Sequence, residues 1–378
     1  MSAHRHLLVA FVAFLPAALP VLAQTPEPTP EPAGNVWGYI FGDYFIKLIG
    51  DEQTWGSGQY ADVEQGMHAG ELRRLYLGYD YRFSPSVSSR VLLEANDATT
   101  FAGGSYGTFI KLGHLSWRHR IGDMPFTANL GLIPTPVFAH PEQTWGYRSV
   151  EKEALNQRGF GRAVDQGLSI VGAMPGSGAT RYHVMVGNNS GTRPARNPYK
   201  AFYGSLSHRL PEQKLSVEVM GSYLPVGRGD GATRIGRFFF GYEPTPFRFG
   251  AEVAGVWDEN PADLGLGLGD RAVRLLTSTF AAVEVPGAPL GVRVFGRYDY
   301  YDPDLNFDAA KGYTEPEAFY RQHLLIGGFD IRPHPRVHVI PNLWVNLYQA
   351  RTGLDETIAP TRPRTPDVVP RLTFYFVY

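Results

Sequence analysis

Apolar and polar residues alternate along most of the chain, in segments of about ten residues that begin near residue 35. In 71–83, for example, Leu75 and Leu77 alternate with Arg74 and Tyr76. Successive side chains of a strand point to opposite faces, so the pattern predicts amphipathic strands. The predicted strands are 35–48, 71–83, 87–97, 109–120, 126–133, 167–174, 180–187, 200–210, 213–224, 233–242, 247–258, 271–285, 290–302, 319–333, 336–351 and 369–378.

The connections between these strands alternate in length. Every second one is a short turn, such as 84–86 or 334–335, and the others are long and polar, such as 49–70 or 303–318. Short periplasmic turns and long extracellular loops alternate in this way in outer-membrane barrels. The predicted fold class is therefore all-β: a transmembrane antiparallel β-barrel of about 16 strands over residues 35–378. An even strand number places both termini on the periplasmic side.

A soluble barrel with an apolar interior has the same periodicity. Aromatic residues at the strand ends and the high density of charge on the other face favour the membrane barrel. Its first and last strands must pair, because lipid offers no partner to an open sheet edge. The C-terminal run 371–378, RLTFYFVY, suits this closing position. A barrel of this size has a lumen that side chains cannot fill, so it holds water or a plug.

The N-terminus has the features of an export signal. Residues 1–23 combine Arg5, an apolar core and small residues before a cleavage point, which predicts a signal peptide; a membrane anchor is the alternative. Residues 24–34 form a Pro-rich spacer. The expected location is the bacterial outer membrane, with its lipid as a partner.

Composition narrows the chemistry. The chain has 378 residues, a formal net charge of −1 and no cysteine. These values argue against a nucleic-acid partner and against disulfides or thiolate metal sites. His334 and His338 lie at a turn and the strand after it, a poor arrangement for a metal. No catalytic residue, metal ligand or cofactor is predicted.

Arginine dominates the polar face of the strands. The predicted pore-wall residues are Arg74, Arg82, Arg90, Arg237, Arg248, Arg293 and Arg297. Guanidinium groups suit carboxylates and phosphates, so this wall favours a mild anion preference. Alternatively, each arginine forms a salt bridge that stiffens the wall.

The longest interruption of the strand pattern is 134–166. Loops of this length inside a compact fold are usually functional or disordered, and this one carries several aromatic residues. A short helix is predicted there, with Ser149 as N-cap, Arg158 in its last turn and Gly159 just after it. Its predicted site residues are the charged ones: Arg148, Glu151, Lys152, Glu153, Arg158, Arg162 and Asp165.

Several segments resemble a known family. They are 38–48 (GYIFGDYFIKL), 71–83 (ELRRLYLGYDYRF), 87–96 (VSSRVLLEAN) and the strand end 131–134 (GLIP) before the long loop. Together with the aromatic C-terminus, they resemble general porins, and more specifically porins of the phosphate-selective O and P type. The resemblance implies that the third long loop folds into the lumen and narrows it, and that subunits form homotrimers. The lysine-rich phosphate sites of the selective members are not visible.

The predicted function is an outer-membrane porin: a passive diffusion channel for small hydrophilic solutes with a mild preference for anions, phosphate among them. A barrel that acts mainly as an adhesin or as a structural component of the envelope is the alternative. An outer-membrane enzyme is a third hypothesis.

Overall fold

The structure is a computed structural model that describes residues 33–51, 59–60, 63–101, 103–176, 178–226, 231–267, 269–351 and 364–378. The predicted signal peptide and spacer residues 24–32 lie outside this range. Ala33 and Gly34, assigned to the spacer by the sequence, pair with Arg82 and Tyr81 and begin the first strand.

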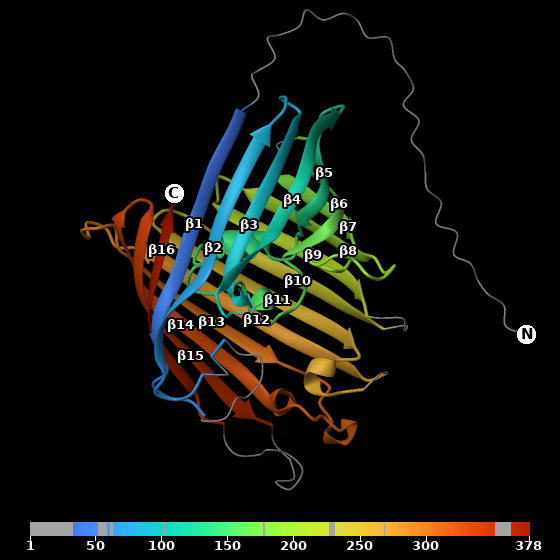
Figure 1. Cartoon of the computed structure of the whole chain (residues 1–378). Helices are drawn as coiled ribbons and strands as arrows, with labels where there is room; N and C mark the ends of the chain where they lie inside the picture. Colours follow the sequence, from blue (N-terminus) through green and yellow to red (C-terminus); the bar gives the residue numbers. More distant parts are fainter. Residues whose placement is uncertain are drawn as a thin grey trace, which may run out of the picture.

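The described residues form a closed antiparallel barrel in which every strand pairs with its sequence neighbours and β1 pairs with β16 (Figure 1). The predicted fold class is confirmed. The strands are β1 (Ala33–Ile46), β2 (His68–Arg82), β3 (Val87–Thr100), β4 (Tyr106–Ile121), β5 (Met124–Pro134), β6 (Val164–Ala173), β7 (Thr180–Gly187), β8 (Ala201–Leu210), β9 (Leu215–Pro225), β10 (Ala232–Tyr242), β11 (Phe247–Glu259), β12 (Arg271–Glu284), β13 (Arg293–Asp302), β14 (Tyr320–His334), β15 (Val337–Ala350) and β16 (Asp367–Val377).

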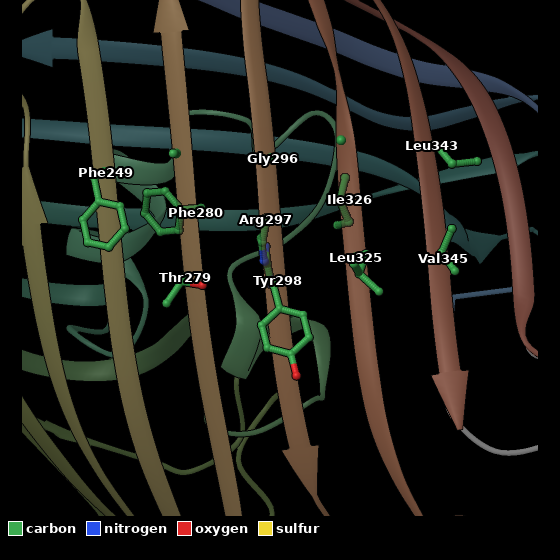
Figure 2. Close-up of a pocket in the computed structure, with 12 residues that line it drawn as sticks. Phe249, Thr279, Phe280, Gly296, Arg297, Tyr298, Leu325, Ile326, Leu343 and Val345 are labelled. Atoms are coloured by element: carbon green, nitrogen blue, oxygen red, sulfur yellow. The ribbon is translucent and has the colours of Figure 1, made fainter. Parts of the chain in front are cut away.

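Side chains alternate between the two faces of the wall as predicted. In β9, Ser216, Glu218 and Met220 are buried, whereas Val217 and Val219 are exposed. Large apolar side chains are exposed on the outer face all round the barrel, among them Tyr44, Leu77, Val91, Leu115, Leu130, Leu168, Val184, Phe202, Val219, Phe238, Val253, Val283, Tyr298, Leu325, Leu343 and Leu372. Figure 2 shows part of this face, an apolar groove of about 710 Å³ along β11–β15.

The barrel closes where the C-terminal strand meets β1. Gly38 and Gly42 leave room on β1 for the rings of Tyr378 and Phe374, since a Cβ at either glycine would come within 2.7 Å of these rings. Backbone hydrogen bonds join Gly38 and Tyr378 in both directions. The aromatic C-terminal run therefore seals the sheet, as the sequence indicated.

Strand ends differ from the prediction in two places that matter for the interior. β3 extends to Thr100 and β4 begins at Tyr106, so the two strands take up most of the predicted loop 98–108. β6 begins at Val164, so the long connection is 135–163 and Asp165 belongs to a strand. We call residues 135–163 the inner loop, because arginines of the barrel wall bind it from inside.

The inner loop contains two helices, α1 (Ala139–Trp145) and α2 (Ala154–Gln157). The prediction of a helix capped by Ser149 is wrong: the N-cap is Glu153, whose carboxylate accepts from the Asn156 amide. Guanidinium groups of Arg73 and Arg297 bind the carbonyls of Ser149, Val150 and Lys152, which a longer helix would need for itself. Helix α1 was missed, although Pro141 in its first turn and Gly146 just after it are signals for one.

Short 3-10 helices, η1 (Ala262–Leu264), η2 (Ala309–Lys311) and η3 (Pro316–Phe319), lie in the long connections before β12 and β14. None of the helices in the described part of the chain has the length and apolar character needed to cross a membrane.

Candidate functional site

The inner loop crosses the inside of the barrel, because it contacts inward-facing side chains of strands on opposite sides. Arg73 of β2 donates to the carbonyl oxygens of Ser149 and Val150 at 3.1 and 2.8 Å. Arg237 of β10 donates to the carbonyl of Val137. Arg297 of β13 donates to the carbonyl oxygen of Lys152. Three wall arginines therefore hold the loop by its backbone.

Aromatic packing fixes the loop against one part of the wall. The Trp145 ring lies 5.1 Å from Phe280 of β12 and 5.9 Å from Phe295 of β13. Tyr147 stacks on Phe295 at 4.3 Å. Aromatic pairs of this kind contribute about 0.5–1.5 kcal/mol each beyond their buried area. The loop is thus strongly attached to β12 and β13.

A second apolar cluster continues this attachment. Val137, Phe138, Leu155 and Phe160 of the loop are buried with residues of β7–β13, among them Tyr203, Met220 and Tyr301. The packed side of the loop therefore faces mainly β7–β16: apart from Ile133 of β5 and Phe45 of β1, the buried strand residues of both clusters belong to these strands.

Glu151 is buried between two wall arginines. Its carboxylate lies 3.8 Å from Arg73 and 3.9 Å from Arg371 of β16. Burial alone raises its pKa, but the nearby Arg73 and Arg371 outweigh burial and lower the pKa below its ordinary value. Glu151 is therefore ionised and serves as an anchor of the loop rather than as a free charge in the lumen.

Glu153 belongs to a denser cluster. Arg237, which has no exposed side-chain surface, lies 3.7 Å from Glu153 and 4.0 Å from Glu252, and it binds Glu218. Burial, and then the neighbouring carboxylate of Glu252, raise the pKa of Glu153 well above its ordinary value. One guanidinium thus serves three carboxylates.

The predicted cations of the loop have a different environment. Arg148 lies 3.1 Å from Glu142. Arg158 binds the Gln322 amide oxygen and stacks 4.8 Å from the Tyr301 ring, and Arg162 binds the Asn189 amide oxygen at 3.0 Å. In the part of the chain that the structure describes, no carboxylate lies within 4.0 Å of the side-chain nitrogens of Lys152, Arg158 or Arg162.

Asp165 is not a loop charge. It is fully buried in β6 and accepts from the backbone amides of Asn189, Ser190 and Gly191 and from the Tyr203 hydroxyl. This arrangement ties the connection 188–200 to the end of the inner loop. Its role is structural support of the lumen mouth.

Most of the predicted wall arginines form ion pairs with wall carboxylates. Arg297 pairs with Asp299, and Arg237 with Glu218 and Glu252. Arg74, Arg90, Arg248 and Arg293 pair with Glu94, Asp80, Glu243 and Glu284. Among the described residues, only Arg82 of this set has no carboxylate partner. The alternative that each arginine forms a salt bridge and stiffens the wall therefore fits the contacts of six of the seven predicted wall arginines.

Sequence alternation missed Arg73. The pairing of β1 with β2 shifts register between Phe41 and Asp43, and this bulge allows both Arg73 and Arg74 to bind groups inside the barrel. The adjacent pair of arginines was the only available signal, because a strict period of two assigns one of them to the outer face.

Two cavities lie at opposite ends of the β2–β5 wall. One, of about 770 Å³, is lined by Lys111, the loop end 161–164 and the connection 189–197, which brings in Arg193 and Arg196. The other, of about 520 Å³, lies near the turn 83–86 and is lined by Arg82, Arg90 and Arg118, among others. Both cavities are basic, and the first also borders the end of the inner loop at 161–163.

Within the described residues, no group of three or more His, Cys, Asp or Glu side chains gathers in a way that would hold a metal ion. His338 instead approaches Asp330 at 2.7 Å.

No protein family model and no curated protein sequence matches the chain. Solved structures do. An anion-selective porin from Comamonas acidovorans has a TM-score of 0.62 at 11% identity, covering 92% of this chain and 100% of its own. The outer membrane channel DcaP of Acinetobacter baumannii has a TM-score of 0.65 at 12% identity, covering 92% and 97%. OmpT of Vibrio cholerae, an outer membrane protein solved in a trimer form, has 0.56 at 8%, covering 92% and 99%. At these identities the likeness establishes a porin-type barrel fold.

Proposed function

We propose that this protein is an outer-membrane porin that lets small hydrophilic solutes diffuse passively, with a mild preference for anions. The observation that carries the preference is the pairing of charges inside the barrel. Seven inward carboxylates of the wall have a basic partner: Asp80, Glu94, Glu218, Glu252, Glu284, Asp299 and Asp330. Several side-chain cations have no carboxylate partner among the described residues. Arg82, Arg118, Arg162, Arg193 and Arg196 line the cavities, and Lys152 and Arg158 lie on the inner loop.

We place the solute path between the inner loop and β1–β6. The other side of the loop is packed with aromatic and aliphatic side chains, whereas both basic cavities border the β2–β5 wall. Arg148 lies on the loop, with its guanidinium 5.9 Å from the Phe41 ring of β1. An excess of fixed positive charge along such a path concentrates anions and repels cations.

The outer face supports a membrane location. Soluble monomers rarely expose continuous apolar patches larger than a few hundred Å², yet apolar side chains cover the outer face of this barrel on every side. Lipid is the solvent that such a surface requires. The predicted signal peptide would supply the export step.

A homotrimer is part of the proposal. Ala281, Gly296 and Gly327 line the outer groove of β11–β15 and would let a second wall approach closely. The solved trimer form of OmpT from Vibrio cholerae has the same fold. Chemical crosslinking of the purified protein in detergent tests this point, with a ladder that stops at three copies as the expected result.

The phosphate-selective type remains a prediction. The arginines of the wall are mostly paired, and the chain has only six lysines, at 47, 111, 152, 200, 214 and 311. We propose a general anion bias and no dedicated phosphate site, and a catalytic role forms no part of the proposal.

Planar-bilayer recording with purified protein tests the function. We expect stepwise conductance. In a KCl gradient, we expect a reversal potential whose sign shows that chloride is more permeant than potassium. Absence of conductance would contradict the channel, and a cation-side reversal potential would contradict the charge argument.

One observation favours the adhesin or structural alternative. The connections before β12 and β14 pack together through Leu264, Tyr313 and Phe319 into a separate buried cluster outside the barrel wall. Such an ordered surface suits binding to another surface. Loss of surface attachment on removal of 303–319, in a protein without conductance, would support this reading.

A further inference from the structure

Three aromatic side chains form a column on the inner face of β1. Trp37, Tyr39 and Phe41 alternate along the strand and therefore share a face. Their ring centroids are 6.3 and 6.4 Å apart, and neighbouring planes differ by only 13° and 8°. The next residue on this face, Asp43, binds Arg73, which holds the inner loop, so the face is the inner one.

Neighbouring strands widen the column into a surface. Tyr76 of β2 lies 4.5 Å from Tyr39, and Tyr375 of β16 lies 6.1 Å from it on the other side. Phe41 and Tyr76 are buried, but Trp37, Tyr39 and Tyr375 are partly exposed. Aromatic surface is thus accessible inside the lumen.

Cations stand at both ends of this aromatic surface. The Arg90 guanidinium lies 5.2 Å from the Trp37 ring and borders the cavity that also contains Arg82 and Arg118. At the other end, the Arg148 guanidinium of the inner loop lies 5.9 Å from the Phe41 ring. A solute that moves from one end to the other therefore passes from cation to aromatic rings to cation.

We infer that this surface is a track for small aromatic anions, with aromatic carboxylates as the chemical class. The inference rests on the proposed channel function and adds a solute class to it. The ring of such a solute stacks on Tyr39 and Trp37, while its carboxylate reaches Arg148 at one end and Arg82 or Arg118 at the other. A saturated ring of equal size and charge lacks the quadrupole that makes stacking favourable.

The test compares benzoate with cyclohexanecarboxylate, which carry the same charge and the same number of ring carbons. Each acid is added to wild-type channels that conduct KCl in a planar bilayer, and the concentration that halves the chloride current is measured. We expect this concentration to be about two- to tenfold lower for benzoate, the range that one aromatic pair provides. Benzyl alcohol, which has the ring without the charge, should block more weakly than benzoate.

A matched pair of variants locates the effect. Tyr39→Leu should remove most of the difference between the two acids. Tyr44→Leu changes the same residue type on the outer face of the same strand, where Tyr44 is exposed, and should retain the difference. Trp37→Leu provides a second inner-face variant if Tyr39→Leu fails to fold.

Equal blocking concentrations for the two acids in the wild-type channel would overturn the track while leaving the channel function intact. Discrimination that survives Tyr39→Leu and Trp37→Leu would overturn the placement on β1. A protein that conducts no chloride would contradict the proposed function and the track together.

Discussion

The two sides of the inner loop differ in how their charges and rings are used. On the side that faces β7–β16, Trp145 and Tyr147 pack on aromatic residues, and the Glu153 carboxylate is buried beside Arg237. On the side that faces β1–β6, Lys152 and Arg162 have no carboxylate partner among the described residues, and two basic cavities are present. Glu151 and Glu153 therefore serve attachment, whereas no carboxylate among the described residues pairs with the side-chain charges of Lys152 and Arg162.

This difference shows why a nearly neutral loop need not give a neutral pore. Buried carboxylates beside guanidinium groups contribute little field outside their own pair, whereas cations without a partner act over a Debye length of about 10 Å at moderate salt. Counting charges in the sequence does not distinguish paired charges from unpaired ones. The burial and pairing of each side chain in the structure distinguish them.

The largest expected effect comes from removing the loop altogether. Replacement of 139–160 by a short Gly-Ser linker eliminates both helices and should raise single-channel conductance more than any point substitution. The reason is that the segment crosses the lumen and contacts β2, β10 and β13. Removal of 303–319, which lies between the strands β13 and β14, is the control. Unchanged conductance in the first variant would place the path elsewhere.

Breaking the attachment should have the next largest effect. Arg237→Met leaves Glu153, Glu218 and Glu252 buried without their shared cation, and loss of one partner of a buried ion pair costs about 3–5 kcal/mol. We expect a lower denaturant midpoint and faster proteolysis within 135–163. Arg336→Met, at an exposed turn, is the control. Equal stability of both variants would mean that Arg237 does not hold the loop.

Charge reversal on the open side should change selectivity with little loss of stability. Lys152→Glu together with Arg162→Glu should move the reversal potential in a KCl gradient toward cation preference. Lys214→Glu, an exposed residue at the β8–β9 turn, makes the same kind of change away from the path and should leave the potential near the wild-type value. A shift from Lys214→Glu of about half that of the double variant, in proportion to its smaller charge change, would indicate a long-range effect of net charge only.

A smaller effect concerns pH. The raised pKa of Glu153 means that the folded protein binds this proton more tightly than the unfolded chain does. Its stabilising contribution is therefore complete below the ordinary value of 4.5 and declines as pH rises toward the raised value. Glu153→Gln, which cannot ionise beside Glu252 and Arg237, should flatten this part of the profile. Melting temperatures of both proteins across a pH series provide the measurement, and parallel profiles would contradict the assignment.

The sequence predicted the barrel well because its signals are local. Strict alternation in segments such as β9 and β11, short turns at every second connection and the aromatic C-terminus define strand number, direction and closure without knowledge of contacts. The errors came where tertiary contacts override local pattern. Arg73 points inward only because of a bulge, and the helix expected at Ser149 yields to arginines that bind its carbonyl groups.

The site was predicted less completely for the same reason. The sequence identified the charged residues of the loop, but which of them are buried depends on strands far away in the chain. Glu151 meets Arg371, and Arg158 meets Gln322. Asp165, expected among the loop charges, belongs to β6, where four backbone amides bind it.

The absence of cysteine from the sequence allows a direct test of the difference between the two sides. Single cysteines at Lys152→Cys, on the open side, and Val150→Cys, fully buried on the packed side, are exposed to a membrane-impermeant anionic thiol reagent during bilayer recording. We expect the reagent to reduce the current through Lys152→Cys channels and to leave the current through Val150→Cys channels unchanged. A reaction at Val150→Cys, or none at Lys152→Cys, would contradict it.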